Sequence, residues 1–151
     1  MSSQISPPLI VVGVDGSEAS RAALRWAARQ AELTGAKLRP VQAWRLPATY
    51  GMPVDYSDAD FEKQARESLR RTVDETLREH PGVPVDPQVV EGHPAVVLTE
   101  AAKDAELLVV GSHGHGAFTG MLLGSVSHHC VHHATCPVLV VRAGTDRPVR
   151  T

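Results

Sequence analysis

The sequence is poor in lysine and has no run of basic residues. Its lysines are Lys37, Lys63 and Lys103, and Lys plus Arg number 15 against 17 Asp plus Glu in 151 residues. Binding to nucleic acid or to an anionic membrane surface needs a concentrated patch of positive charge. We therefore expect neither nucleic acid nor a membrane as a partner.

Long apolar runs are also missing. The runs present are far shorter than the ~20 residues that span a bilayer. They lie at residues 9–12, 107–110 and 138–141. The first eight residues lack the charged start and apolar segment of a signal peptide. We therefore expect a cytoplasmic protein, in which a structural disulfide between Cys130 and Cys136 is the less frequent outcome.

Short apolar runs alternate with segments of helical periodicity along the chain. We expect strands at 9–14, 38–44, 85–90, 107–110 and 138–141. We expect helices at about 17–34, 58–77, 94–105 and 125–134. Pro40 is predicted near one end of its strand, and Pro87 indicates that its strand lies near the sheet edge.

This alternation of strands and helices predicts the α/β fold class. Right-handed crossovers between successive strands give an open five-stranded parallel sheet with helices on both faces. The length suits a single domain with a sizeable core. The segment 45–57 has no periodicity, and its position after a strand predicts a loop that lies over a ligand.

The segment from Gly111 to Ser127 carries the clearest functional signal. It has five glycines within fourteen residues, directly after the apolar run 107–110. Glycines let main-chain N–H groups turn inward and let a ligand approach the backbone closely. The helix that follows adds unpaired amides in its first turn and the hydroxyls of Ser125 and Ser127. The segment therefore predicts an anion site.

The better-known phosphate loops do not fit this segment. A Walker loop needs Gly-Lys-Ser/Thr, but Gly124 is followed directly by Ser125. A dinucleotide fingerprint that begins at Gly114 needs a glycine where Thr119 stands. The spacing that is present is Gly-x2-Gly-x9-Gly-Ser, which begins at Gly111.

With this spacing the chain resembles the universal stress protein family, in its ATP-binding branch. Further stretches match the family in the same order, at 11–17, 104–110 and 134–142. The resemblance covers roughly 8–143 as one domain, with 1–7 and 144–151 as flexible tails. It implies a Rossmann-like fold of the adenine nucleotide alpha hydrolase-like type, with strand order 3-2-1-4-5.

The resemblance also implies a ligand, ATP, with or without Mg²⁺. The positions that it assigns to the site are Val14, Asp15, Ala43, Gly111, Ser112, Gly114, Gly124, Ser125, Val126 and Ser127. Asp15 would hold the sugar or a phosphate-bound metal, whereas the alternative is that it only caps the turn at the start of a helix. Ala43 would offer main-chain groups to adenine.

Histidine replaces fixed positive charge in this version of the loop. His115 stands where the family often has arginine, and Ala117 where it often has glycine. Affinity for phosphate could therefore be lower or depend on pH. Four more histidines form i, i+4 pairs on the last helix, and we expect them to be surface groups rather than a metal site. They are His128, His129, His132 and His133.

Three functions remain open, of which we favour an ATP-binding regulatory module of the stress response. The second is a slow ATPase or self-phosphorylating protein, and the third is a dimeric partner protein that binds no nucleotide. The loop has no Walker lysine, arginine or general base, which argues for binding without rapid turnover. We therefore assign no catalytic residue. The family commonly forms homodimers through the strand at 138–141, and the protein partner is unknown.

Overall fold

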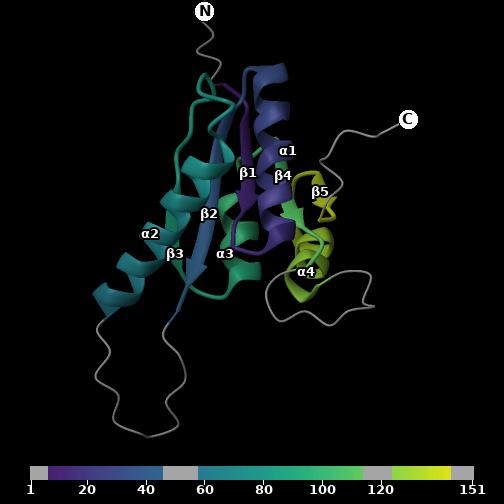
Figure 1. The fold of residues 1–151 in the computed structure, drawn as a ribbon. Helices are drawn as coiled ribbons and strands as arrows, with labels where there is room; N and C mark the ends of the chain where they lie inside the picture. Colours follow the sequence, from purple (N-terminus) through teal and green to yellow (C-terminus); the bar gives the residue numbers. More distant parts are fainter. Residues whose placement is uncertain (1–6, 46–57, 114–123, 144–151) are drawn as a thin grey trace, which may run out of the picture.

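The computed structural model describes residues 7–45, 58–113 and 124–143 (Figure 1). The strands are β1 (Leu9–Gly13), β2 (Lys37–Trp44), β3 (Gln88–Glu91), β4 (Leu107–Gly111) and β5 (Val138–Val141). The helices are α1 (Glu18–Thr34), α2 (Asp58–Thr76), α3 (Pro94–Ala101) and α4 (Ser125–His133). The strands form a five-stranded parallel sheet in the order β3-β2-β1-β4-β5. The predicted fold class and strand order are confirmed.

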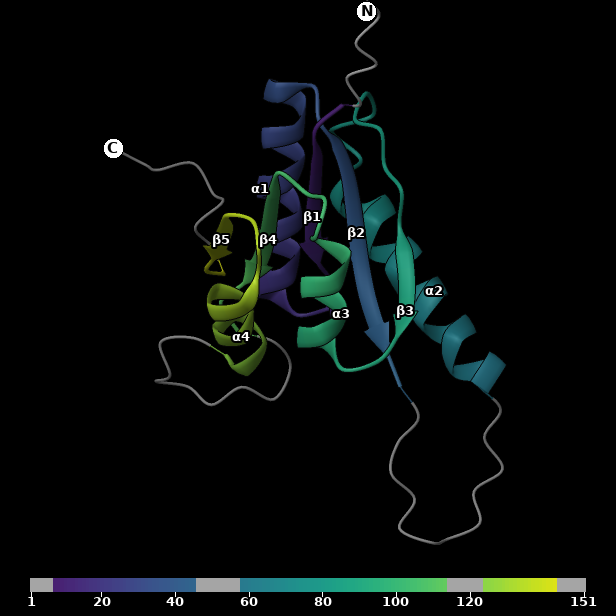
Figure 2. The same ribbon diagram turned by 180° about the vertical axis from the view of Figure 1, so that it is seen from behind.

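Helices cover both faces of this sheet (Figures 1 and 2). Ile10, Val12 and Val109 pack in one core cluster with α1 and α2. Val11 and Leu108 pack on the opposite face, in the cluster formed with α3 and α4. Because successive side chains of a strand point to opposite faces, burial on both sides requires unbroken apolar runs. Within the described ranges, no helix combines the length and apolar character needed to cross a membrane.

Helix α1 begins and ends at the predicted residues. The Ser17 hydroxyl caps it by accepting a hydrogen bond from the Ser20 N–H, at 3.2 Å. Gly35 ends it in the left-handed conformation, at φ 74°, with its N–H bonded to the Ala31 carbonyl. The buried face of α1 is rich in alanine, which lets the helix lie close to the sheet.

Pro40 lies in the middle of β2, so its predicted place near a strand end is wrong. Leu38 exchanges main-chain bonds with Pro84 and Asp86, so Pro40, two residues further on, also turns its main-chain groups toward β3. The register places Pro87 opposite Pro40. β3 is an edge strand, as Pro87 predicted. Because Pro40 turns toward β3, the hydrogen bond that its missing N–H cannot make is lost only between β2 and this edge strand. The interior strand β2 therefore accommodates its proline.

Two elements are shorter than predicted. β3 begins at Gln88 rather than at residue 85, and Val85 forms only an isolated bridge ahead of Pro87. α3 ends at Ala101 rather than near residue 105, because the chain then tightens into three-residue turns. These turns are closed by hydrogen bonds from Lys103 N–H to Glu100 O and from Ala105 N–H to Ala102 O.

The ends of β1 and β4 are fixed to each other through helix α1. The two strands pair directly, and Gly111 at the end of β4 lies against the first turn of α1. A Cβ atom at Gly111 would stand 2.7 Å from the Ala19 carbonyl carbon and 2.9 Å from the Ser20 nitrogen. We predicted that glycine here serves a ligand's approach, but the packing of α1 already requires it.

Replacing Gly111 with alanine should therefore destabilise the protein. The added methyl group would meet the α1 main chain, and overpacking of this kind costs about 1–3 kcal/mol. Gly82→Ala is the matched control, because nothing lies within 4 Å of a Cβ there. Urea unfolding should show a loss for Gly111→Ala and none for Gly82→Ala; equal midpoints would contradict this packing argument.

Candidate functional site

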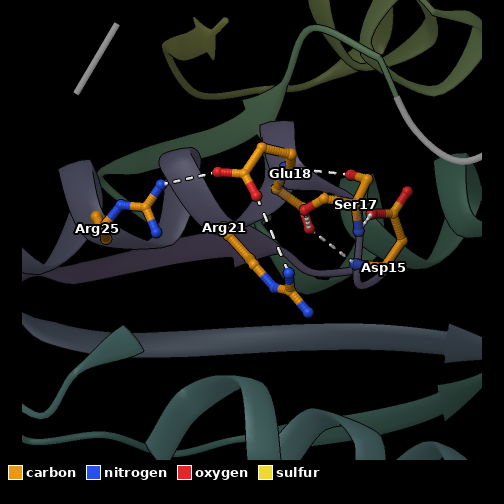
Figure 3. A network of polar contacts seen from close by, with 6 residues as sticks. Asp15, Ser17, Glu18, Arg21 and Arg25 are labelled. Carbon is orange, nitrogen blue, oxygen red and sulfur yellow. Dashed lines mark hydrogen bonds and ion pairs between the residues drawn. The ribbon is translucent and has the colours of Figure 1, made fainter. Parts of the chain in front are cut away.

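The turn from β1 into α1 places Asp15 at the carboxyl edge of the sheet (Figure 3). The Asp15 carboxylate accepts a hydrogen bond from the Ser17 N–H at 2.9 Å, and the Asp15 N–H donates to the buried Ser20 hydroxyl at 3.3 Å. Gly16 between them has φ 82°, which favours glycine. Asp15 therefore has the turn-capping role that we considered as the alternative. A carboxylate has about four acceptor sites, so one hydrogen bond does not by itself fill it.

The nearby arginines of α1 are bound to a carboxylate on the same helix. Glu18 lies 3.3 Å from the Arg25 guanidinium and 3.9 Å from that of Arg21 (Figure 3). Such solvent-exposed pairs contribute little stability. Their effect on the site is electrostatic, since Glu18 partly offsets the positive charge that α1 brings to this edge.

Ala43 presents its main chain beside the end of β1. The Val14 N–H bonds to the Val41 carbonyl at 2.9 Å, so Val41 faces β1 and Ala43, two residues on, faces the same way. In the described part of the chain, the β1–β2 ladder ends at the pair of Gly13 and Val41. The N–H and C=O of Ala43 therefore face the Asp15 turn with no strand opposite them.

Ser112 connects the end of β4 to the start of α4. Its N–H donates to the Val141 carbonyl at 2.8 Å, and its carbonyl accepts from the Gly124 N–H at 2.6 Å and from the Ser127 hydroxyl at 3.0 Å. The Ser127 hydroxyl also lies 3.0 Å from the Gly124 carbonyl and is buried. Its single proton is thus directed to carbonyl groups, so in this conformation it is no phosphate donor, contrary to the role we predicted.

The first turn of α4 has main-chain amides without an intrahelical partner, as the sequence predicted. Gly124 is the N-cap, at φ −71° and ψ 166°, and has no side chain with which to cap. The first intrahelical bond runs from the His128 N–H to the Gly124 carbonyl. The amides of Ser125, Val126 and Ser127 precede that bond, and among the described residues no side chain caps them.

The structure thus gathers most of the predicted site at one edge of the sheet. The residues found there are Val14, Asp15, Ala43, Gly111, Ser112, Gly124, Ser125, Val126 and Ser127. Gly114 lies outside the described residues. Sequence reasoning missed Ser20, which fixes the Asp15 turn from within α1. Its position three residues after an N-cap serine was the available signal.

The histidines of α4 form two pairs of rings in tilted contact. The ring centroids of His128 and His132 lie 4.5 Å apart, and those of His129 and His133 lie 4.4 Å apart. Among the described residues, no group of three or more His, Cys, Asp or Glu side chains could hold a metal ion.

Both cysteines are free thiols. Burial raises the pKa of Cys130 to about 11, and it also raises the pKa of Cys136. Because the thiolate is the reactive form of cysteine, neither thiol has the character of a nucleophile.

Because the α4 histidines contact one another only in pairs, zinc should bind weakly and add little thermal stability. A pair of imidazoles provides two ligands, whereas structural zinc sites have four. A sub-micromolar site would stabilise the fold by several kcal/mol at saturating metal. Melting temperatures with excess zinc and with a chelator should agree closely, and a large rise with zinc alone would contradict the assignment of these histidines as surface groups.

Known proteins resemble this chain in both sequence and fold. Residues 9–142 match the universal stress protein family. A universal stress protein of Mycobacterium tuberculosis is 40% identical over 134 residues, which make up 88% of this chain and 45% of that protein. A universal stress protein of Mycolicibacterium smegmatis is 39% identical over 133 residues, with the same two coverages of 88% and 45%. The chain spans about half the length of the curated relatives it matches.

Solved structures of the family superpose on the chain along most of its length. A universal stress protein in complex with cAMP has a TM-score of 0.72 at 28% identity, covering 91% of this chain and 98% of that one. One from Archaeoglobus fulgidus in complex with dAMP has a TM-score of 0.66 at 25% identity, covering 91% and 99%. Sequence and fold agree, and the chain belongs to the universal stress protein family.

Proposed function

We propose that the chain is a regulatory module that binds an adenine nucleotide, ATP foremost, at the carboxyl edge of the sheet. The observation that carries this proposal is the pair of main-chain surfaces left without partners among the described residues. One is the Ala43 edge of β2, and the other is the first turn of α4. Two related proteins have been solved with cAMP and with dAMP, which supports an adenine nucleotide as the ligand.

The phosphates would bind at the first turn of α4. The amides of Ser125 and Val126 and the exposed Ser125 hydroxyl are the donors, and the positive end of the helix dipole adds to their attraction. Ser127 contributes indirectly, because its hydroxyl holds this turn against the Ser112 carbonyl. Gly114, outside the described residues, remains part of the proposed loop.

Adenine would lie beside Ala43 and the sugar near Asp15. A main-chain N–H and C=O side by side match the acceptor and donor pattern of an adenine edge. The Asp15 carboxylate suits a ribose hydroxyl or Mg²⁺, whereas it would repel a bare phosphate. Mg²⁺ neutralises phosphate charge when bound and needs only one or two protein carboxylates. Asp15, at the exposed end of β1, fits that requirement.

Binding without rapid turnover is the activity we favour. Phosphoryl transfer needs neutralised charge and a positioned nucleophile. Among the predicted site residues that the structure covers, Asp15 is the one carboxylate, and the others offer main-chain groups and hydroxyls. The residues 113–124 contain no lysine or arginine that could offset the charge of a transferring phosphoryl group.

Replacing Ser125 tests the role of the α4 turn. Ser125→Pro removes both an N–H and a hydroxyl, yet proline suits the first position of a helix, and Gly124 already has the extended conformation that a following proline requires. Ser125→Ala removes the hydroxyl alone. A bond to a charged acceptor contributes about 1.5–3 kcal/mol, so affinity for Mg²⁺-ATP should fall about 10- to 100-fold with alanine and further with proline.

Calorimetric titration measures both variants, and circular dichroism checks that α4 is retained. Asp15→Asn in the same assay should weaken binding mainly when Mg²⁺ is present, if the carboxylate holds the metal. If folded Ser125→Pro binds ATP as tightly as the unaltered protein, the phosphates do not lie at α4. If the unaltered protein binds no adenine nucleotide at all, the proposed function is wrong.

The chain should also form a homodimer through β5. Bonds from Leu108 N–H to Pro137 O and from Ser112 N–H to Val141 O show that alternate residues of β5 face β4. Val138 and Val140 therefore turn their main-chain groups toward the open edge of the sheet. An apolar edge strand of this kind favours pairing across a two-fold axis.

Val140→Pro should shift the protein toward monomer. It removes an outward N–H, and an edge strand tolerates proline there because β4 loses no bond. Val140→Thr is the matched control, because it keeps the N–H and the branched shape. Light scattering across a concentration series should show weaker association for the proline variant alone; an unaltered chain that stays monomeric at high concentration would exclude this interface.

A further inference from the structure

His93 is the N-cap of helix α3. Its Nδ1 accepts a hydrogen bond from the Ala95 N–H at 3.2 Å, and Pro94 occupies the first helical position. An imidazole nitrogen accepts a hydrogen bond only when it carries no proton. The cap therefore requires neutral His93 with its hydrogen on Nε2. Protonation at Nδ1 would remove the acceptor and place a positive charge at the positive end of the helix dipole.

Helix α4, which carries His129 and His133, packs against the helix that this cap begins. Helices α3 and α4 pack side by side in the same core cluster, on the face of the sheet seen in Figure 2. His129 stacks on His133, with ring centroids 4.4 Å apart. Burial lowers the pKa of His129, and the positive charges of His133 and His93 lower it further. Three imidazoles from two helices thus influence one another.

Helix α3 has no acidic residue in its first turn, and α4 has none in its first turn either. The neighbouring charges are Glu91 on β3 and Arg45 after β2, both exposed, and the Gly92 N–H bonds to the carbonyl of Trp44 just before Arg45. Glu91, the nearest acid along the chain, is exposed, as are His93 and His133, so solvent screens both its attraction and the repulsion among the imidazolium groups.

We propose that His93, His129 and His133 form a proton-sensitive latch that holds the first turn of α3 in place at neutral pH and releases it in mild acid. Two effects act in the same direction. Protonation of His93 removes the cap, and protonation of all three rings makes them repel one another across the α3–α4 contact. The proposal does not include the other ring pair, His128 and His132, whose ring contact is with each other.

The sign of the pH dependence follows from His129. Its pKa in the folded chain lies below the ordinary value of 6.5, so the unfolded chain binds more protons. Stability therefore rises with pH through this range. The stabilising contribution of the neutral form is present above the ordinary value and is lost as pH falls below it. Loss of the His93 cap adds to the same trend.

Hydrogen exchange of the Val97 amide reports on the latch, because this N–H bonds to the His93 carbonyl at 2.9 Å. Between about pH 7.5 and about pH 5.5, the range in which histidines titrate, local opening should increase roughly fivefold or more after correction for the intrinsic exchange rate. His93→Asn supplies a cap that does not titrate, so its opening should change little over the same range.

Matched variants on α4 complete the test. His129→Asn should reduce the response to pH, whereas His128→Asn, on the neighbouring pair, should keep the full response. Far-ultraviolet circular dichroism at neutral pH confirms that each variant is folded. The proposal is overturned if His93→Asn opens in acid as readily as the unaltered chain, or if His128→Asn abolishes the response as His129→Asn does.

Discussion

The carbonyl of Ser112 is the acceptor on which the arrangement of the site depends. It receives two hydrogen bonds, from the Gly124 N–H and from the Ser127 hydroxyl, while the Ser112 N–H binds the end of β5. One buried peptide unit thus sets the position of α4 relative to β4 and β5. The first turn of α4 faces the carboxyl edge because these bonds are made there, and buried hydrogen bonds of this kind are expensive to leave unmade.

The fold was predictable because its determinants are periodic. Both faces of the sheet are buried, so β1, β4 and β5 are apolar runs, and α1 and α2 each bury one apolar face. The strand order came from resemblance to the universal stress protein family, since apolar runs do not state which strand lies beside which. Pro40 was misplaced because the register that sets it against Pro87 depends on strands 47 residues apart, as the pairing of Leu38 with Val85 shows.

The site was predictable in outline but not in the role of each atom. Gly111 and Ser127 both belong to the predicted segment, yet the neighbours that define them are Ala19 on α1 and the Ser112 carbonyl. A motif shows which residue types recur at a spacing, but it does not show whether a glycine makes room for a helix or for a ligand. The capping role of His93 was not predicted for a different reason. Histidine rarely caps a helix, so its residue type does not indicate this local hydrogen bond.

The hydrogen bonds of Ser112 also determine which stretch of the chain can change in length and sequence without disturbing the scaffold. They fix the two ends of the glycine-rich segment, at Ser112 and Gly124, without reference to the residues between them. The entropy of closing a loop changes only slowly with its length. Insertions, deletions or exchanges between those two anchors can therefore alter what the segment recognises while the scaffold stays the same, which makes this stretch a natural place for ligand preference to diverge among related chains.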